Sequence, residues 1–262
     1  MSRSLAKWDQ RIRRAAELAT KHPFAVEALS FYERLASFQK SLYASLDGRG
    51  AGSLRQELDL PLLLPHFAPF LSLIETIAPP LLAQSAAELK AGREARWRNV
   101  LEEFWSHSEQ INDTEAFLAW TFLQPYAENL ADQTQPTQNQ ETTPALCPLC
   151  SSQPQVGVLR PQGDGGKRSL ICSLCATEWD YRRILCPACG EEDVDKLPVY
   201  TAEELPHVRV EACDTCRHCI KTIDLTKDGR AVPVVDELAA IPLSLWAAEN
   251  GYSKVSANLL GL

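Results

Sequence analysis

The sequence predicts an α+β protein: an all-α N-terminal domain, then two tandem ribbon-like four-cysteine metal modules, then a C-terminal helix. Three observations lead to this prediction, namely helical periodicity in the first half, a polar break near the middle, and cysteines confined to the second half. The chain has 262 residues, 45% of them hydrophobic and 23% charged, as in globular proteins. Its formal net charge of −8 argues against a general polyanion binder.

The first predicted domain covers residues 1–131 and is helical. Apolar side chains recur at helical spacing at Phe31, Leu35, Phe38 and Leu42. Because Pro23 is tolerated in a first turn, one helix is predicted over 23–45, after an earlier helix at about 4–21. A further helix is predicted over 85–107, and Asp113 is the expected cap of the next one.

The most apolar stretch, 58–83, is predicted to form buried helical pieces with bends. Five prolines interrupt it, and its longest proline-free piece, 70–78, has nine residues, whereas a bilayer needs roughly 20. The N-terminal sequence also lacks the apolar core of a secretory signal. We therefore expect no membrane span and a cytoplasmic location.

A polar linker is predicted over 132–144. This segment reads DQTQPTQNQETTP and has no aliphatic side chain, so it cannot bury enough surface to offset its ordering entropy. Downstream, short β-prone runs at 155–160, 168–172 and 207–212 alternate with glycine and proline. The last segment, 236–262, returns to a helical pattern.

All nine cysteines follow residue 146, and eight of them form C-x-x-C pairs. Two such turns can supply the four thiolates of a tetrahedral metal site. The predicted ligands are Cys147, Cys150, Cys172, Cys175, Cys186, Cys189, Cys213 and Cys216. The second pair of each set follows the first by 21 or 23 intervening residues, enough for a strand, a turn and a returning strand.

The two sets form an internal repeat. Corresponding cysteines are shifted by 39 or 41 residues, and the two copies open with LCPLC and LCPAC. This repeat predicts one four-cysteine ribbon over 145–184 and a second over 185–235. Crossed pairing between the two sets stays open at the level of sequence.

Metal binding is favoured over disulfides and dithiol catalysis. Disulfides are rare in a reducing compartment and nine is an odd number, while the βαβ context of a redox C-x-x-C is missing. Four thiolates suit zinc and also a single iron of the rubredoxin kind, so the metal stays open between the two. Cys219 and His218 are predicted to be non-ligands because four thiolates already close each site.

The charge of the cysteine-bearing half and the missing catalytic motifs argue against a nucleic-acid-binding protein and against an enzyme. Residues 144–262 carry 12 basic and 16 acidic side chains, and each tetrathiolate site adds negative charge. The small clusters Lys167–Arg168 and Arg182–Arg183 do not make a nucleic-acid surface, so no nucleic-acid partner is expected. Hydrolase, phosphate-loop and metalloprotease motifs are missing, so the chain is not expected to be an enzyme. An iron-based electron-transfer protein and a nucleic-acid ribbon remain the alternatives.

The motifs resemble the formate dehydrogenase accessory proteins of bacteria. The resemblance lies in CPLC, CSLCATEWDYRRILCPACG and EACDTCRHCIK, and extends to RIRRAAELA, FYERLASFQ, FLQPYAE and the tail DELAAIPLSLWAAENGYSKVSANLLG. The family pattern has tyrosine at the position of Cys219, aspartate at Ser244 and arginine at Lys254. These departures leave the eight paired cysteines unchanged.

The resemblance implies a cytoplasmic assembly factor that contacts the catalytic subunit of a molybdenum-dependent formate dehydrogenase before export. It also implies two metal ions, iron in rubredoxin-like sites or zinc, held by the eight paired cysteines. We expect Glu178, Trp179, Arg182 and Arg183, which lie between the two sites in sequence, to form the partner surface. The oligomeric state stays open, a homodimer included.

Overall fold

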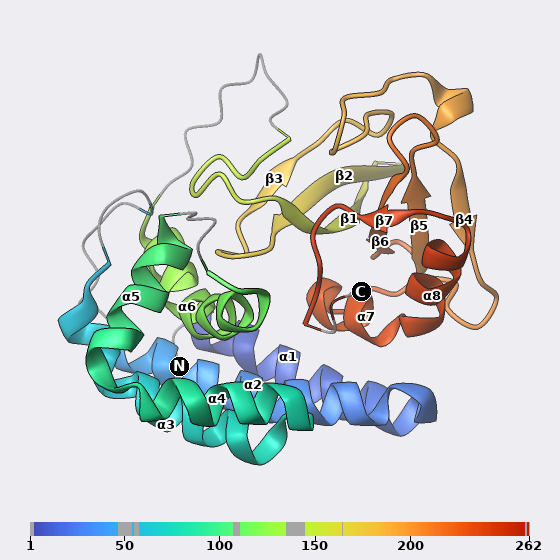
Figure 1. Ribbon diagram of the computed structural model, residues 1–262. Helices are drawn as coiled ribbons and strands as arrows, with labels where there is room; N and C mark the ends of the chain where they lie inside the picture. The colour runs from blue at the N-terminus through green and yellow to red at the C-terminus, as the bar shows by residue number, and fades with distance from the viewer. Residues whose placement is uncertain are drawn as a thin grey trace.

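The computed structural model of the chain describes residues 3–46, 54, 58–106, 111–134, 145–163, 165–259 and 261. A helical domain forms one side of the molecule and a sheet carrying the cysteines forms the other, with the C-terminal helices between and beside them (Figure 1). The predicted α+β class is therefore confirmed. Residues 135–144 of the predicted linker lie outside the described residues, and its first two residues belong to the last helix of the helical domain.

The helical domain contains α1 (Arg3–Lys21), the 3-10 turn η1 (Pro23–Ala25), α2 (Val26–Ser45), α3 (Leu60–Ile77), α4 (Pro80–Ala91), α5 (Arg93–Trp105) and α6 (Asp113–Gln133). The helix expected over 23–45 begins with η1, where the amide of Ala25 donates to the carbonyl of His22. Asn112, and not Asp113, caps α6, since its side chain accepts hydrogen bonds from the amides of Thr114 and Glu115.

The apolar stretch forms helical pieces with one break, at Ala78 and Pro79 between α3 and α4, whereas the prolines inside α3 do not interrupt it. Pro61, Pro65 and Pro69 recur at intervals of four and all lie on its exposed face. The carbonyls left without partners by the prolines can then bond to water, so the helix continues. By length and composition α3 is the single described helix that could cross a membrane. Its opposite face forms the core of the helical domain, with no exposure at Leu63, Phe67, Phe70, Leu71 and Ile74.

The single helix expected over 85–107 is wrong, since α4 and α5 are separate. Gly92 ends α4, and Arg93 has a positive φ of 61° that breaks the helical path. Residue 107 lies outside the described residues. The two short helices pack around α3 and α6, where the Phe67 and Phe122 rings meet edge to face at 4.8 Å.

The strands are β1 (Pro154–Gln162), β2 (Gly165–Cys172), β3 (Glu178–Asp180), β4 (Val199–Thr201), β5 (Val208–Ala212), β6 (His218–Asp224) and β7 (Ser253–Lys254). They form one sheet in the order β3-β2-β1-β6-β5-β4, with β7 on β6. A further 3-10 turn, η2 (Val194–Lys196), precedes β4. The strand, turn and returning strand expected between paired cysteines are β1–β2 in the first set and β4–β5 in the second.

The two ribbons share a continuous sheet, which the sequence did not predict. Strand β1 of the first pairs in parallel with β6 of the second through three residue pairs, among them Gly157 and Thr222. A Cβ on Gly157 would lie 2.2 Å from the Thr222 hydroxyl oxygen, so glycine is required for this approach. Strand β6 was also not predicted from the sequence, because its Lys221 and Thr222 are polar although both are buried.

The C-terminal segment has two short helices, α7 (Pro233–Ala239) and α8 (Ile241–Glu249), in place of one continuous helix. Pro242 lacks the amide that would continue α7, and it begins α8 instead. Helix α7 lies between α1 and the sheet (Figure 1). Helix α8 lies against the second ribbon, where the Trp246 and Tyr200 rings approach to 4.4 Å.

Candidate metal centres

The four C-x-x-C turns have the same backbone geometry. In each, the amide of the first cysteine donates to the carbonyl five residues later, as from Cys147 to Ser152 at 2.9 Å and from Cys213 to His218 at 2.9 Å. The residue four positions after the first cysteine has a positive φ in all four turns: Ser151 at 62°, Ala176 at 51°, Gly190 at 77° and Arg217 at 59°. The sequence shows this requirement only at Gly190, because only glycine adopts it without strain.

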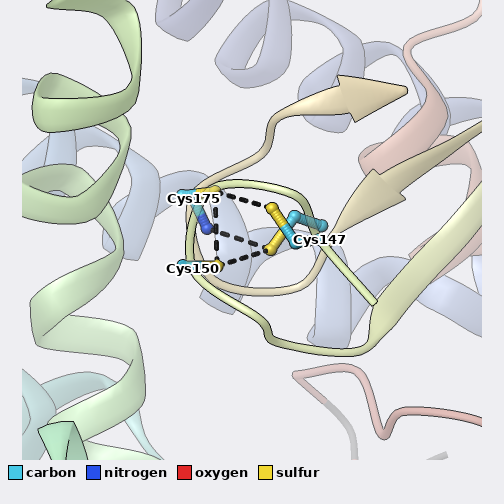
Figure 2. A group of neighbouring side chains, drawn as sticks. Cys147, Cys150 and Cys175 are labelled. Carbon is cyan, nitrogen blue, oxygen red and sulfur yellow. Dashed lines mark hydrogen bonds between the residues drawn. The ribbon is translucent and has the colours of Figure 1, made fainter. Parts of the chain in front are cut away.

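The turns bring the thiols together in two groups, Cys147, Cys150, Cys172 and Cys175, and Cys186, Cys189, Cys213 and Cys216. This is the tandem arrangement, and not the crossed one. We call them the first and second clusters. Figure 2 shows the sulfur atoms of Cys147, Cys150 and Cys175 pointing toward one another.

The sulfur spacings fit a metal tetrahedron and not disulfides. In the first cluster, Cys147 and Cys175 sulfurs lie 3.6 Å apart and those of Cys150 and Cys172 3.3 Å apart. In the second cluster, both recorded spacings are 3.7 Å. A disulfide requires about 2.05 Å. A tetrahedron with metal–sulfur bonds of about 2.3 Å has edges of about 3.8 Å, so both clusters could hold one ion.

Electrostatics also favour a cation in each cluster. Burial and the neighbouring thiols raise the pKa of Cys172, and burial raises the pKa of Cys186. Thiols packed this closely cannot all ionise without a positive charge among them. Backbone amides of Leu174 and Cys175 point at the Cys172 sulfur, at 3.4 and 3.5 Å, which favours a thiolate there.

The two clusters differ in burial. All four cysteines of the first cluster are buried, whereas Cys189 of the second is exposed and Cys216 is half-buried. The first cluster belongs to the same apolar core as the helical domain. Helix α6 holds it directly, since Trp120 Nε1 and Gln124 Nε2 both donate to the carbonyl of Ser173, at 3.1 and 3.0 Å.

Arg168 connects the two ribbons, a role the sequence analysis missed. In the sequence it forms a small basic cluster with Lys167, but its side chain is 1% exposed and pairs with Glu211 at 2.6 Å. Its Nη1 donates to the carbonyl of Arg182, and its guanidinium lies 5.0 Å from the Tyr181 ring centroid. Thus β2 of the first ribbon is tied to β5 of the second and to the segment between them.

The four residues expected to form the partner surface are not all on the surface. Trp179 is 3% exposed and belongs to the apolar core, so its side chain does not lie on the surface. Glu178 is half-buried and accepts hydrogen bonds from Arg160 and Ser169. Burial raises the pKa of Glu178, but these two hydrogen bonds outweigh burial and lower it. Only Arg182 and Arg183 are exposed, and Arg182 pairs with Glu192.

Cys219 lies outside both clusters. It is buried in β6, and burial raises the pKa of its thiol. His218 also lies outside them, with its Nδ1 2.9 Å from the carbonyl of Cys216.

The positive φ of Gly190 predicts that a branched side chain at this position lowers the stability of the second ribbon. We expect Gly190→Val to destabilise the second ribbon by about 1–2 kcal/mol, because a branched side chain is strained in the left-handed region. The measurement is metal retention against a chelator, together with thermal unfolding. The control is Gly165→Val, since a Cβ there meets nothing within 4 Å and its φ is not positive. Equal losses in the two variants would contradict the assigned strain.

Comparisons with known proteins agree with this structure. The sequence matches the family models "FdhE, central domain" over residues 146–183 and "FdhE, C-terminal domain" over 184–260. A protein FdhE homolog from Aquifex aeolicus is 29% identical, covering 95% of this chain and 94% of that protein. One from Pseudomonas aeruginosa is 39% identical over 44% of this chain and 39% of its own length. The crystal structure of the FdhE protein from Pseudomonas aeruginosa superimposes with a TM-score of 0.74 and 26% identity, covering 99% of this chain and 96% of that one.

A helical domain docked on a two-cluster sheet defines a two-part protein with two four-cysteine sites that could each bind a metal ion. The crystal structure of the Pseudomonas aeruginosa FdhE protein shares this architecture along nearly the whole chain. The cysteine-bearing half of the chain, residues 146–260, matches the two FdhE domain models, and the chain as a whole is similar to FdhE proteins in sequence and structure.

Proposed function

We propose that the chain is a cytoplasmic factor that binds the catalytic subunit of a molybdenum-dependent formate dehydrogenase before export. Similarity to FdhE proteins supports the formate dehydrogenase partner. The observation that carries the binding role is the exposed surface beside the second cluster. It combines the cations Arg182 and Arg183 with Ile184, which is 47% exposed.

More exposed apolar side chains lie in the second ribbon, which begins directly after Ile184. Val194 is 61% exposed and Val199 52% exposed. Val199 and Arg183 line one shallow cavity of about 50 Å³ together with Cys186 and Cys213 of the second cluster. Apolar groups with arginine at their border are typical of protein interfaces, so this surface suits a protein partner. We name Arg182, Arg183, Ile184, Val194 and Val199 the ribbon surface.

We further propose that each cluster holds one ion, iron or zinc, through its four cysteines. The ligands of the first ion are Cys147, Cys150, Cys172 and Cys175, and those of the second are Cys186, Cys189, Cys213 and Cys216. Either ion links the turns of a ribbon, and iron also supplies one-electron redox chemistry. The chain's own part is to fix the turns, exclude water from the first cluster and present the second at the surface.

The binding proposal is tested by pull-down of the catalytic subunit with the metal-loaded chain. We expect Ile184→Asp to reduce capture at least tenfold, because it places a charge within the apolar part of the ribbon surface. Leu81→Asp is the matched control: Leu81 is 75% exposed but lies on α4 of the helical domain. Both changes are at exposed positions, so both variants should fold.

Two outcomes would contradict the binding proposal: no capture by the unmodified chain, and equal capture by Ile184→Asp and the unmodified chain. A second function, electron transfer, is favoured by one observation, the exposure of Cys189 at the second cluster. Elemental analysis and absorbance distinguish the two, since a ferric tetrathiolate is coloured and zinc is not. Zinc in both clusters would exclude electron transfer and leave the binding role intact.

A further inference from the structure

A cavity of about 340 Å³ lies beside α8 and the segment that follows it, apart from the two clusters. None of the eight clustered cysteines lines it. Its polar lining includes Lys221, Lys254 and Ser244 beside Tyr252 and Ser253, and Leu243 and Ala247 contribute an apolar wall. This volume is at the lower end of the range for small-molecule clefts, so the cavity is large enough for a small ligand.

Two ammonium groups and one carboxylate lie together at this cavity. The side chains of Lys221, Lys254 and Glu237 are 3%, 9% and 0% exposed. Both ammonium nitrogens contact the same Glu237 oxygen, Oε1, at 2.8 Å from Lys221 and 2.7 Å from Lys254. In the part of the chain that the structure describes, Glu237 is the only carboxylate paired with either lysine. The group therefore carries one more positive charge than negative.

The hydrogen bonds show which ammonium can accept another partner. Lys221 also donates to the Glu237 carbonyl at 2.7 Å and to the Ser244 hydroxyl at 2.6 Å, so its donors are used. For Lys254 the structure records one hydrogen bond, to Glu237, of the three that an ammonium can donate. The Glu237 oxygen that Lys254 contacts, Oε1, already accepts from Lys221 and from the Asn258 amide as well.

Among the residues that the structure describes, no second carboxylate pairs with this excess charge. Burial lowers the pKa of Lys254, against the opposing effect of Glu237. The thiol of Cys219, which also lines the cavity, does not supply the missing negative charge, since burial raises its pKa. A buried charge without a counter-charge is strongly unfavourable, and an anion in the cavity would remove that cost.

We propose that this cavity binds a small monovalent oxyanion, a short-chain carboxylate, that neutralises the group formed by Lys221, Glu237 and Lys254. The carboxylate accepts hydrogen bonds from Lys254 and from the Ser244 hydroxyl, whose own hydrogen is free to donate while its oxygen accepts from Lys221. A short alkyl group contacts Leu243 and Ala247. This site does not depend on the formate dehydrogenase partner.

Isothermal titration calorimetry with the metal-loaded full chain tests the site. The probes are formate, acetate and propionate, each compared with chloride at equal ionic strength. We expect saturable binding of a carboxylate, weakened at least tenfold in Lys254→Met. Ser244→Asp should abolish binding, because it places a carboxylate beside the Lys221 ammonium. Lys227→Met, which removes an exposed lysine elsewhere on the second ribbon, should bind as the unmodified chain does.

Three results would overturn the proposal. They are no saturable carboxylate binding, chloride binding as tight as that of every carboxylate, and unchanged binding in Ser244→Asp. Should Lys254→Met fail to fold, Ser244→Asp decides alone, since it removes no ion pair. Its folding is checked by circular dichroism and metal content.

Discussion

Replacing Cys172 and Cys175 with serine is expected to unfold the sheet domain and release it from the helical domain. All four cysteines of the first cluster are buried, and they belong to the core that includes α6 and α7. A structural tetrathiolate site contributes on the order of 10 kcal/mol to folding, which is comparable with the whole stability of a domain. Near-UV circular dichroism and limited proteolysis should both show the loss.

The matched control is the double substitution of Cys189 and Cys216 in the second cluster. Because these side chains are exposed and half-buried, the variant should lose one ion per chain while the helical domain and first ribbon remain folded. Elemental analysis gives the ion count, and hydrogen exchange shows which segments open. If the two double variants lose the same structure, the inferred difference between the clusters is wrong.

Asp236→Ala is expected to destabilise the whole chain by about 2–4 kcal/mol, because it removes a buried carboxylate and leaves Arg14 only its more exposed partners Glu17 and Asp228. Asp236 is 1% exposed and accepts two hydrogen bonds from Arg14, at 2.6 and 3.0 Å. It also lies 2.9 Å from His207 Nε2 and accepts from the amide of Val232 at 2.7 Å. This network fastens α1 of the helical domain to α7 and to the second ribbon.

Chemical denaturation at neutral pH measures the loss, with Asp180→Ala as control. Asp180 pairs with Lys167 at 2.6 Å, but its side chain is 53% exposed, so its removal should cost no more than about 1 kcal/mol. A loss below about 1 kcal/mol for Asp236→Ala would contradict the assigned role.

The contribution of Asp236 should depend on pH with a definite sign. Burial raises its pKa, but hydrogen bonds from His207 and Arg14 outweigh burial, so the pKa of Asp236 in the folded chain is lower than its ordinary 3.8. The stabilisation is therefore complete above that ordinary value and is lost as pH falls through the lower folded value. The gap in unfolding free energy between the unmodified chain and Asp236→Ala should narrow from about pH 4 downward.

Local patterns accounted for the helical first half and both cysteine quartets. The apolar spacing that predicts a helix such as α2 can be read within a few turns of the chain, and a C-x-x-C turn depends only on the few residues that form it. The same local rules failed at α3, whose prolines all face solvent, and at Arg93, where the helix breaks. The continuity of α3 does not follow from composition, because it depends on which face of the helix meets the core.

The sequence by itself determined the helical character of the first half, the four C-x-x-C pairs and the repeat that relates the two ribbons, and it favoured the tandem grouping that the structure shows. The tertiary structure decided that the ribbons share one sheet, that one cluster is buried and the other exposed, and that Trp179 and Arg168 are interior residues. It also decided which charged side chains pair, since Arg14 and Asp236 form an ion pair although they are 222 positions apart in the sequence. Spacing within a turn is a local property, whereas burial and charge balance depend on segments that only the folded chain brings together.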